Sequence, residues 1–375
     1  GYGSTSTSFV GASITDFDFY TAVDLWFTNQ ALAESTYGLI GDWNVSAVTV
    51  MAQAFYPSRS GGSAINTFNE DISAWDTSSV TNMIYMFNQA TSFNQPLNWD
   101  VSSVTTMGGM FNQATSFNQP LNWDTSSVTN MLKMFFSATA FNQPLNWDVS
   151  SVTNMQSMFY GASAFNGTLT FSDTSSVTNM SGMFRSATAF NQPLNWDVSS
   201  VANMSYMFSS ATSFNQPLNW DVGSVTDMSY MFTSATSFNQ PLTWDVSSVG
   251  NMSNMFNSAT SFNQPLNWNT SSVINMNGMF AYASSFDQPL NWNTSSVTLM
   301  LSMFLNATSF NQPLTWDTSS VTTIYKMFYQ AIAFDQPLNW DVSSVTTMQQ
   351  TFQSVNFSTT NYDLILVYWQ NALQS

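Results

Sequence analysis

The sequence contains similar copies of a segment of about 24 residues, and in nearly every copy a carboxylate side chain directly follows a tryptophan. Carboxylate oxygens are ligands that Ca²⁺ prefers, so cations between successive members could hold such a column together. The full column is Asp76, Asp100, Asp124, Asp148, Asp173, Asp197, Asp221, Asp245, Asp317 and Asp341. The candidate calcium ligands among them are Asp100, Asp124, Asp148, Asp197, Asp221 and Asp245.

A second interpretation of this column needs no metal. An Asp or Asn side chain can accept hydrogen bonds from the backbone N–H groups of the turn that follows it. Asn44, Asn269 and Asn293 replace Asp in other copies, and a turn tolerates that exchange easily. The Gly-Gly-x-Gly-x-Asp pattern of calcium-binding repeats is also absent. We therefore predict turns with no metal and no cofactor, and keep structural calcium as the less favoured alternative.

The same carboxylates raise the question of catalysis, because two acids are enough to hydrolyse a glycosidic bond. A catalytic pair should stand in a local departure from the repeat, whereas nearly all the acids here are repeated column members. The departures are residues 57–63, residues 168–173, and the pair Glu70 and Asp71. None of them combines an acid pair with a cation or a general base, and the chain has no His or Cys. We predict that the protein is not an enzyme.

A second polar column follows the phenylalanines. Side chains of this type can bond to one another along a stack, so we predict an inward-facing structural Asn ladder. The Gln at the next position is expected to point the other way and form an exposed ladder. The column consists of Asn69, Asn94, Asn118, Asn142, Asn166, Asn191, Asn215, Asn239, Asn263 and Asn311, with Asp287 and Asp335 interrupting it.

These columns exist because the chain repeats itself. Residues 93–116 read FNQPLNWDVSSVTTMGGMFNQATS, and the copy that starts at Phe117 reads FNQPLNWDTSSVTNMLKMFFSATA. Leu97 and Trp99 are two residues apart, which is the period of a strand, and a second short extended piece follows them. The spacing of the apolar positions in 110–114 predicts one tight helical turn.

A lone coil of this kind cannot bury its aromatic and Met side chains, whereas stacked coils bury them as continuous ladders. We therefore predict a parallel, leucine-rich-repeat-like solenoid of about thirteen 24-residue coils, each with short strands and one helical turn. Helices over 16–37 and 362–373 should cap the two ends. The predicted organisation is a flexible arm or linker at 1–13, an N-terminal helical cap at 14–42, the repeat solenoid at 43–355 and a C-terminal helical cap at 356–375.

Charge is scarce and strongly unbalanced. Lys and Arg together number 4, Asp and Glu number 21, and the formal net charge is −17. Nucleic-acid binding needs many cations, so we expect no nucleic-acid partner. No apolar run has the length of a membrane span, so we expect no membrane insertion. Because the chain begins at Gly1 without Met, we interpret it as processed or as a segment of a longer chain.

Nine Asn-x-Ser/Thr acceptors agree with a secreted glycoprotein. They are Asn44, Asn166, Asn179, Asn203, Asn251, Asn269, Asn293, Asn306 and Asn356.

The segments SSVTNMIYMF from Ser78, SSVTNMQSMF from Ser150 and SSVTNMSGMF from Ser175 closely resemble the tandem repeats of BspA-like leucine-rich-repeat surface proteins. This variant of the repeat is usually described only as a domain of unknown function. The resemblance covers nearly the whole chain. It implies a leucine-rich-repeat-like solenoid displayed outside the cell, with adhesive, matrix or cell-surface roles, and it supplies no ligand.

We predict an extracellular or cell-surface structural and adhesive repeat protein, in the form of a glycosylated subunit of a filament or surface coat. The expected partners are other copies of the chain, glycans, and cell-surface or matrix components. The alternative is a surface-displayed monomeric adhesin that binds a glycan or a receptor. A carbohydrate-active solenoid enzyme ranks third.

Overall fold

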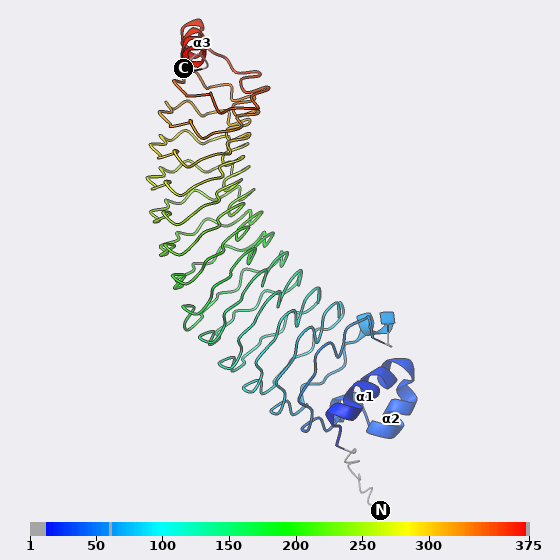
Figure 1. Ribbon diagram of the computed structural model, residues 1–375. Coiled ribbons are helices and arrows are strands. Elements are labelled where there is room, and N and C mark those ends of the chain that lie inside the picture. The colour runs from blue at the N-terminus through cyan, green and yellow to red at the C-terminus, as the bar shows by residue number, and fades with distance from the viewer. Residues whose placement is uncertain (1–12, 60–61, 373–375) are drawn as a thin grey trace, which may run out of the picture. The chain divides into compact units, whose positions relative to one another are not determined.

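The computed structural model describes residues 13–59 and 62–372, and Figure 1 shows its coils and helices. The chain forms two compact units. The first comprises Gly1–Val152 and Ala162–Ser172, and the second comprises Thr153–Gly161 and Asp173–Ser375. Each unit is a stack of similar coils. Most of the arm predicted at 1–13 lies outside the described residues.

Neighbouring coils within each unit pair in parallel, which confirms a repeat solenoid. Single-residue bridges make this pairing, for example Asn82 with Thr106 in the first unit and Asn203 with Asp227 in the second. The predicted short strands are wrong, because the described part of the chain contains isolated bridges and no extended strand. The reason is local: in most coils a run of turns begins two residues after the bridging residue.

The predicted helical turn is also wrong, and the hydrogen bonds explain why. In residues 204–211, alternate N–H groups donate to carbonyls of the next coil at 2.7–3.0 Å, namely those of Met204, Tyr206, Phe208 and Ser210. The N–H groups between them donate three residues back within their own coil, namely those of Met207, Ser209 and Ala211. A helical turn would direct its N–H groups back along its own chain, whereas this alternation gives half of them to the neighbouring coil.

This alternation requires left-handed backbone at two positions per coil, four residues apart. Tyr206 and Ser210 both have φ of 59°, and the corresponding Tyr230 and Ser234 have φ of 58° and 56°. A left-handed residue other than glycine costs roughly 1–2 kcal/mol because its Cβ approaches the following carbonyl. Among the described residues, the non-glycine occupants of these positions are Gln, Tyr, Lys, Ser and Asn, and none is β-branched.

Aromatic ladders fill the core of each unit. Phe87 and Phe111 stack with centroids 5.6 Å apart in the first unit, as do Phe232 and Phe256 in the second. Tryptophans form a parallel ladder, and most of them also donate an indole N–H to the preceding coil, as Trp123 Nε1 does to the Leu97 carbonyl at 3.0 Å. Each coil therefore contributes both apolar area and hydrogen bonds to its neighbour.

The N-terminal cap is two helices rather than the single helix predicted over 16–37. Helix α1 (Asp16–Thr28) ends at Asn29, whose side chain accepts a hydrogen bond from Leu32 N–H at 3.2 Å and thereby starts α2 (Gln30–Tyr37). Trp26 of α1 packs edge-on against Trp43 at 6.0 Å. Two 3₁₀ helices follow in the same unit, η1 (Ile40–Asp42) and η2 (Gly62–Thr67).

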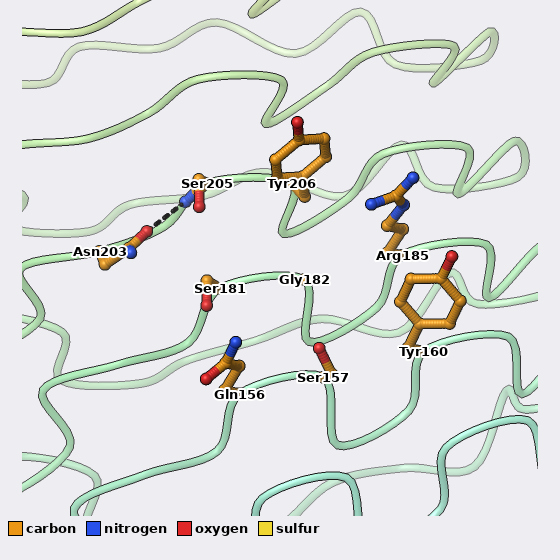
Figure 2. A pocket seen from close by; sticks show the side chains of 9 residues that line it. All are labelled: Gln156, Ser157, Tyr160, Ser181, Gly182, Arg185, Asn203, Ser205 and Tyr206. Carbon is orange, nitrogen blue, oxygen red and sulfur yellow. Dashed lines mark hydrogen bonds between the residues drawn. The ribbon is translucent and has the colours of Figure 1, made fainter.

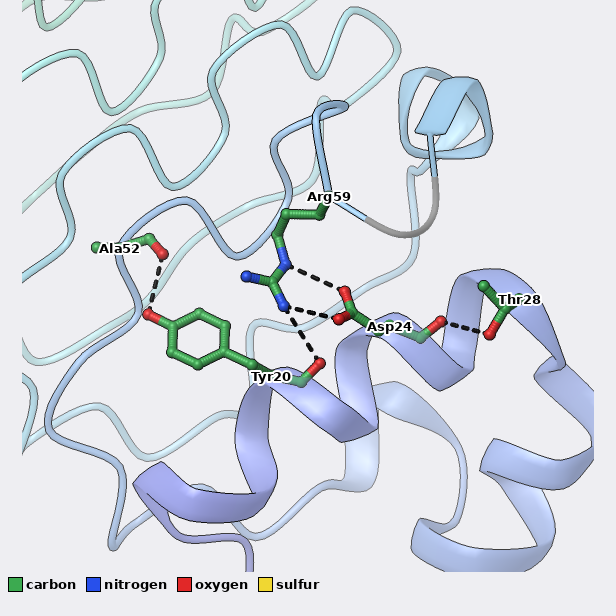
Figure 3. A network of polar contacts seen from close by, with 5 residues as sticks. All are labelled: Tyr20, Asp24, Thr28, Ala52 and Arg59. Carbon is green, nitrogen blue, oxygen red and sulfur yellow. Dashed lines mark hydrogen bonds and ion pairs between the residues drawn. The ribbon is translucent and has the colours of Figure 1, made fainter.

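A polar contact fastens α1 to the departure from the repeat around residue 59. Arg59 forms an ion pair with Asp24 at 2.9 Å, and its guanidinium lies 4.5 Å from the centre of the Tyr20 ring. The Tyr20 hydroxyl donates to the Ala52 carbonyl at 2.9 Å (Figure 3). Because both helix and coil supply partners, this segment serves to hold the cap in place.

The C-terminal cap is α3 (Thr359–Ala372), which begins three residues earlier than the predicted 362–373. The start is fixed by Ser358, whose N–H donates to Asp335 Oδ1 at 2.9 Å and whose hydroxyl accepts from Asn361 N–H at 3.4 Å. Trp369 of this helix packs on Phe352 of the second unit with ring centroids 5.5 Å apart.

The left-handed positions give a direct test of this coil geometry. We expect Ser234→Val to lower the free energy of unfolding by about 1–2 kcal/mol, because a β-branched side chain cannot adopt the φ of 56° cheaply. Ser237→Val is the matched control, since Ser237 lies in the same coil, is exposed and is absent from the left-handed positions. Urea denaturation monitored by tryptophan fluorescence measures both. Equal losses in the two variants would contradict the turn geometry.

Candidate functional site

Differences between coils concentrate at four positions of the turn segment, and we call these positions the variable face of each unit. They form two pairs, each ending at a left-handed residue, such as 205–206 and 209–210. In the first unit the other pairs include 84–85, 88–89, 108–109, 112–113, 132–133 and 136–137. In the second unit they include 156–157, 160–161, 181–182, 185–186, 229–230, 233–234, 277–278, 281–282, 325–326 and 329–330.

The residue types on the variable face differ from those of the rest of the coil. Three of the chain's 4 cations lie there, namely Lys133, Arg185 and Lys326. Seven of its 13 tyrosines do as well, namely Tyr85, Tyr160, Tyr206, Tyr230, Tyr282, Tyr325 and Tyr329. Tyr and Arg are enriched where proteins recognise partners, because both supply large contact area together with polar groups.

These side chains form clusters in the second unit. The Arg185 guanidinium lies 5.1 Å from the Tyr160 ring centre and 4.6 Å from that of Tyr206 (Figure 2). Tyr206 stacks on Tyr230 of the next coil at 4.5 Å with planes 4° apart. Burial raises the pKa of Tyr206, and the neighbouring Tyr230 contributes to that rise. The hydroxyl is therefore protonated, and able to donate a hydrogen bond, throughout the neutral range.

The constant positions of the repeat, on which the predictions were based, do not include this face. The relevant signal was available in the sequence: within otherwise uniform copies, only a few positions vary in size, charge and aromatic character. A position that must fill the core or close a turn tolerates few residue types. Variation therefore marks the positions whose side chains the fold constrains least.

The Asp column forms turns, as predicted. The Ser102 N–H donates to Asp100 Oδ1 at 3.0 Å, and the Ser199 N–H donates to Asp197 Oδ1 at 2.9 Å. The pKa of each of these two carboxyls is lowered, first by the serine side chain and then by the serine N–H. Asn293 makes the equivalent bond to Ser295 N–H at 3.1 Å. Among the described residues, no group of three or more acidic side chains is placed to hold a metal ion.

The Asn column is structural, although its geometry differs from the predicted inward-facing ladder. These side chains are partly exposed, and each Oδ1 accepts a hydrogen bond from the backbone of the next coil, for example Asn239 N–H to Asn215 Oδ1 at 2.9 Å. The following Gln does not form a separate ladder, because Gln240 Nε2 donates to the same Asn215 Oδ1 at 3.1 Å. Two donors thus converge on one amide oxygen, which explains why Asp287 can replace Asn: its Oδ1 accepts from Asn311 N–H at 2.9 Å.

The nine predicted glycosylation acceptors are distributed along the chain and form no cluster. Five of them are exposed, namely Asn44, Asn166, Asn269, Asn293 and Asn356. The other four are partly buried, namely Asn179, Asn203, Asn251 and Asn306. Asn203 shows why: its Oδ1 accepts a hydrogen bond from Ser205 N–H at 2.9 Å in a second turn of the coil, which the sequence analysis did not anticipate.

The segments that depart from the repeat, which were considered above for catalysis, contain none of the positions that form the variable face. Glu70 and Asp71 line a hollow of about 230 Å³ beside α2, together with Glu34 and Asp42. The Asp71 carboxyl has a lowered pKa because the Ser73 side chain and N–H donate to it, whereas a catalytic acid needs a raised one. Asp173 of the 168–173 segment makes the same kind of turn, accepting from Ser175 N–H at 2.9 Å.

Comparisons with known proteins identify the repeat. The family model described as "Mycoplasma protein of unknown function, DUF285" matches overlapping segments at 21–146, 58–171, 97–195, 145–242, 167–267, 195–290, 219–315 and 266–364. No curated protein matches the sequence. No helix within 13–59 and 62–372 is long and apolar enough to cross a membrane.

Among solved structures, the chain is similar to one in the "Crystal structure of TLR13-ssRNA13 complex". The identity is 10% and the TM-score is 0.28, with 86% of this chain and 54% of that chain covered. The chain thus spans about half the length of that protein, and nothing about a ligand follows from a likeness at this level.

The Asp column can be tested by pH and by calcium. A carboxyl whose pKa is lower in the folded state than in the unfolded state stabilises the fold at pH values above its unfolded-state pKa of about 3.9. This stabilisation is lost as the pH falls through the folded-state pKa. We therefore expect acid to destabilise the wild type more than a variant with Asp100→Asn, Asp197→Asn and Asp317→Asn. At pH 7 the melting temperatures should agree, because Asn already forms this turn in three coils.

The same pair of proteins addresses the calcium alternative. We expect neither Ca²⁺ nor a chelator to change the melting temperature of either protein at pH 7. A calcium-dependent rise in the wild type that the triple variant lacks would restore the metal interpretation of the Asp column.

Proposed function

The chain belongs to the DUF285 family of repeat proteins, and we propose that it is a binding protein that recognises its partner through the variable face. One observation carries this proposal: cationic and tyrosine residues gather at four positions of the coil, which hold three of the 4 cations and seven of the 13 tyrosines. A scaffold that keeps its core constant while varying one face has the organisation expected of a recognition surface.

The backbone of the variable face supports this role. Half of its N–H groups donate to the neighbouring coil and the others close turns, so the segment is held in place along its length. A rigid backbone loses little entropy on binding, and tyrosine adds contact area with only two rotatable bonds to immobilise. The proposed site is therefore preorganised.

The charge of the chain limits the class of partner. With a net charge of −17, strongly anionic polymers are repelled at long range, and the few cations can serve only local contacts. Neutral or weakly acidic polar partners fit best, and we propose glycans and the glycosylated components of a cell surface or matrix. An extracellular or cell-surface location agrees with the five exposed Asn-x-Ser/Thr acceptors, whose glycosylation is part of the same proposal.

Self-assembly into a filament or surface coat is a separate proposal, motivated by the uniform polar columns. The caps oppose assembly by end-to-end coil pairing, because α1 covers the first coils of one unit and α3 packs on the last coils of the other. A filament or coat would therefore have to form by side-by-side association of the molecules. We propose no catalytic role and no cofactor, which agrees with the absence of His and Cys.

Electron microscopy at physiological salt separates binding from assembly. We expect dispersed single particles, because the helical caps cover coil edges that would otherwise be exposed, and because the net charge makes protein molecules repel one another. Regular filaments or sheets that form as concentration rises would instead favour the structural role.

A glycan array tests the proposed binding face. We expect a variant with Tyr206→Ser, Tyr230→Ser and Tyr325→Ser to lose the signals that the wild-type chain gives. Serine is compatible with the left-handed backbone at two of these positions, since Ser157 and Ser302 occupy it in other coils. The matched control replaces Gln216, Gln240 and Gln264 with Ala and should keep the wild-type pattern.

Circular dichroism must show that both variants fold. The proposal fails if the two variants lose binding equally, or if the wild-type chain binds no glycan on the array.

A further inference from the structure

One hollow interrupts the variable face of the second unit, and its cause is a missing side chain. Gly182 occupies a left-handed position between Ser157 of the preceding coil and Tyr206 of the following one. A Cβ atom at Gly182 would lie 3.2 Å from the Ser157 hydroxyl oxygen, so any side chain there would enter the space. The resulting hollow has a volume of about 270 Å³ (Figure 2).

The rim of this hollow carries a cation that is not neutralised by a carboxylate. Within 13–59 and 62–372, the only ion pair joins Arg59 to Asp24, so no acidic group lies within 4 Å of the Arg185 guanidinium. Tyr160 and Tyr206 contact the guanidinium through their rings, and no described acceptor takes a hydrogen bond from it. Its planar set of N–H donors is thus available to a ligand, held between two rings that limit its freedom.

The remaining lining is polar and uncharged. It comprises the hydroxyls of Ser157, Ser181 and Ser205 and the side-chain amides of Gln156 and Asn203. Hydroxyl and amide groups donate and accept hydrogen bonds, which suits a ligand that itself carries several hydroxyls. Tyr160 and Tyr206 also line the hollow and contribute hydroxyl groups, which can donate and accept hydrogen bonds.

We propose that this hollow binds the carboxylate of an acidic sugar within a glycan. A guanidinium can hold a carboxylate with two parallel hydrogen bonds, and the surrounding hydroxyls and amides would hold the sugar hydroxyls. The hollow lies just below the roughly 300–1,000 Å³ typical of drug-sized ligands, so it suits one sugar unit. The inference rests on the proposed function and names a ligand class for one part of the variable face.

The charge of the whole chain makes the proposal more specific. A single guanidinium in a protein of net charge −17 favours a ligand with an isolated carboxylate over a densely sulfated or phosphorylated polymer. The other cation of this unit's variable face, Lys326, is remote along the chain and lies 5.1 and 5.4 Å from the ring centres of Tyr325 and Tyr329.

Isothermal titration of the full chain with three small probes tests this assignment. Methyl β-D-glucuronide carries both a sugar ring and a carboxylate, methyl β-D-glucoside lacks the carboxylate, and acetate lacks the ring. We expect saturable binding of the glucuronide, and affinities lower by about tenfold or more for the other two. Equal affinity for glucuronide and glucoside, or for glucuronide and acetate, would overturn the proposal, as would no saturable binding of the glucuronide.

Variants locate the site. Arg185→Gln should weaken glucuronide binding by about tenfold or more, and Gly182→Tyr should abolish it by filling the hollow, in a position where tyrosine already occurs at 206 and 230. Gln264→Ala lies outside the variable face and should leave the affinity unchanged. Retained binding in Arg185→Gln, or an equal loss in Gln264→Ala, would refute the site. Glycan-array signals that persist while the glucuronide fails to bind would reject this site and leave the proposed function standing.

Discussion

The structure depends on one constraint: each coil must share its backbone hydrogen bonds with the next coil while closing its own turns. The alternation in residues 204–211 satisfies both demands, since every second N–H group leaves the coil and the intervening ones stay within it. Left-handed residues at 206 and 210 are the consequence, and their conformational cost is repaid by contacts that recur in every coil. A regular strand or helix would satisfy only one of the two demands.

This constraint separates the residues that stabilise the fold from those that are free to vary. Core positions such as Phe232 and Phe256 must stack ring on ring, and Asn215 must accept two donors from its neighbour. The variable face is less constrained: its left-handed positions avoid β-branched residues, and several positions before them hold buried serines such as Ser205 and Ser229. Chemistry can therefore change from coil to coil on that face without changing the stack, which is why we place recognition there.

The charged side chains are also divided between positions that stabilise the fold and positions that vary from coil to coil. Carboxylates such as Asp100 and Asp197 lie at exposed turns, where serine donors lower their pKa and water screens their mutual repulsion. Cations occupy a different part of the coil, beside aromatic rings, as Arg185 does between Tyr160 and Tyr206. A strongly acidic protein can thus present locally cationic sites.

The sequence alone determined the repeat, the parallel stacking, the turn role of the Asp column and the presence of helices near both ends, because periodic apolar positions and turn-forming side chains act locally. It misjudged the short strands, the helical turn at 110–114 and the single helix over 16–37. Those depend on where N–H groups find partners in another coil, or on one residue such as Asn29 starting a new helix. Only tertiary structure decided that Gly182, Arg185 and Tyr206 enclose one hollow, since residues in neighbouring coils meet through stacking and not through sequence proximity.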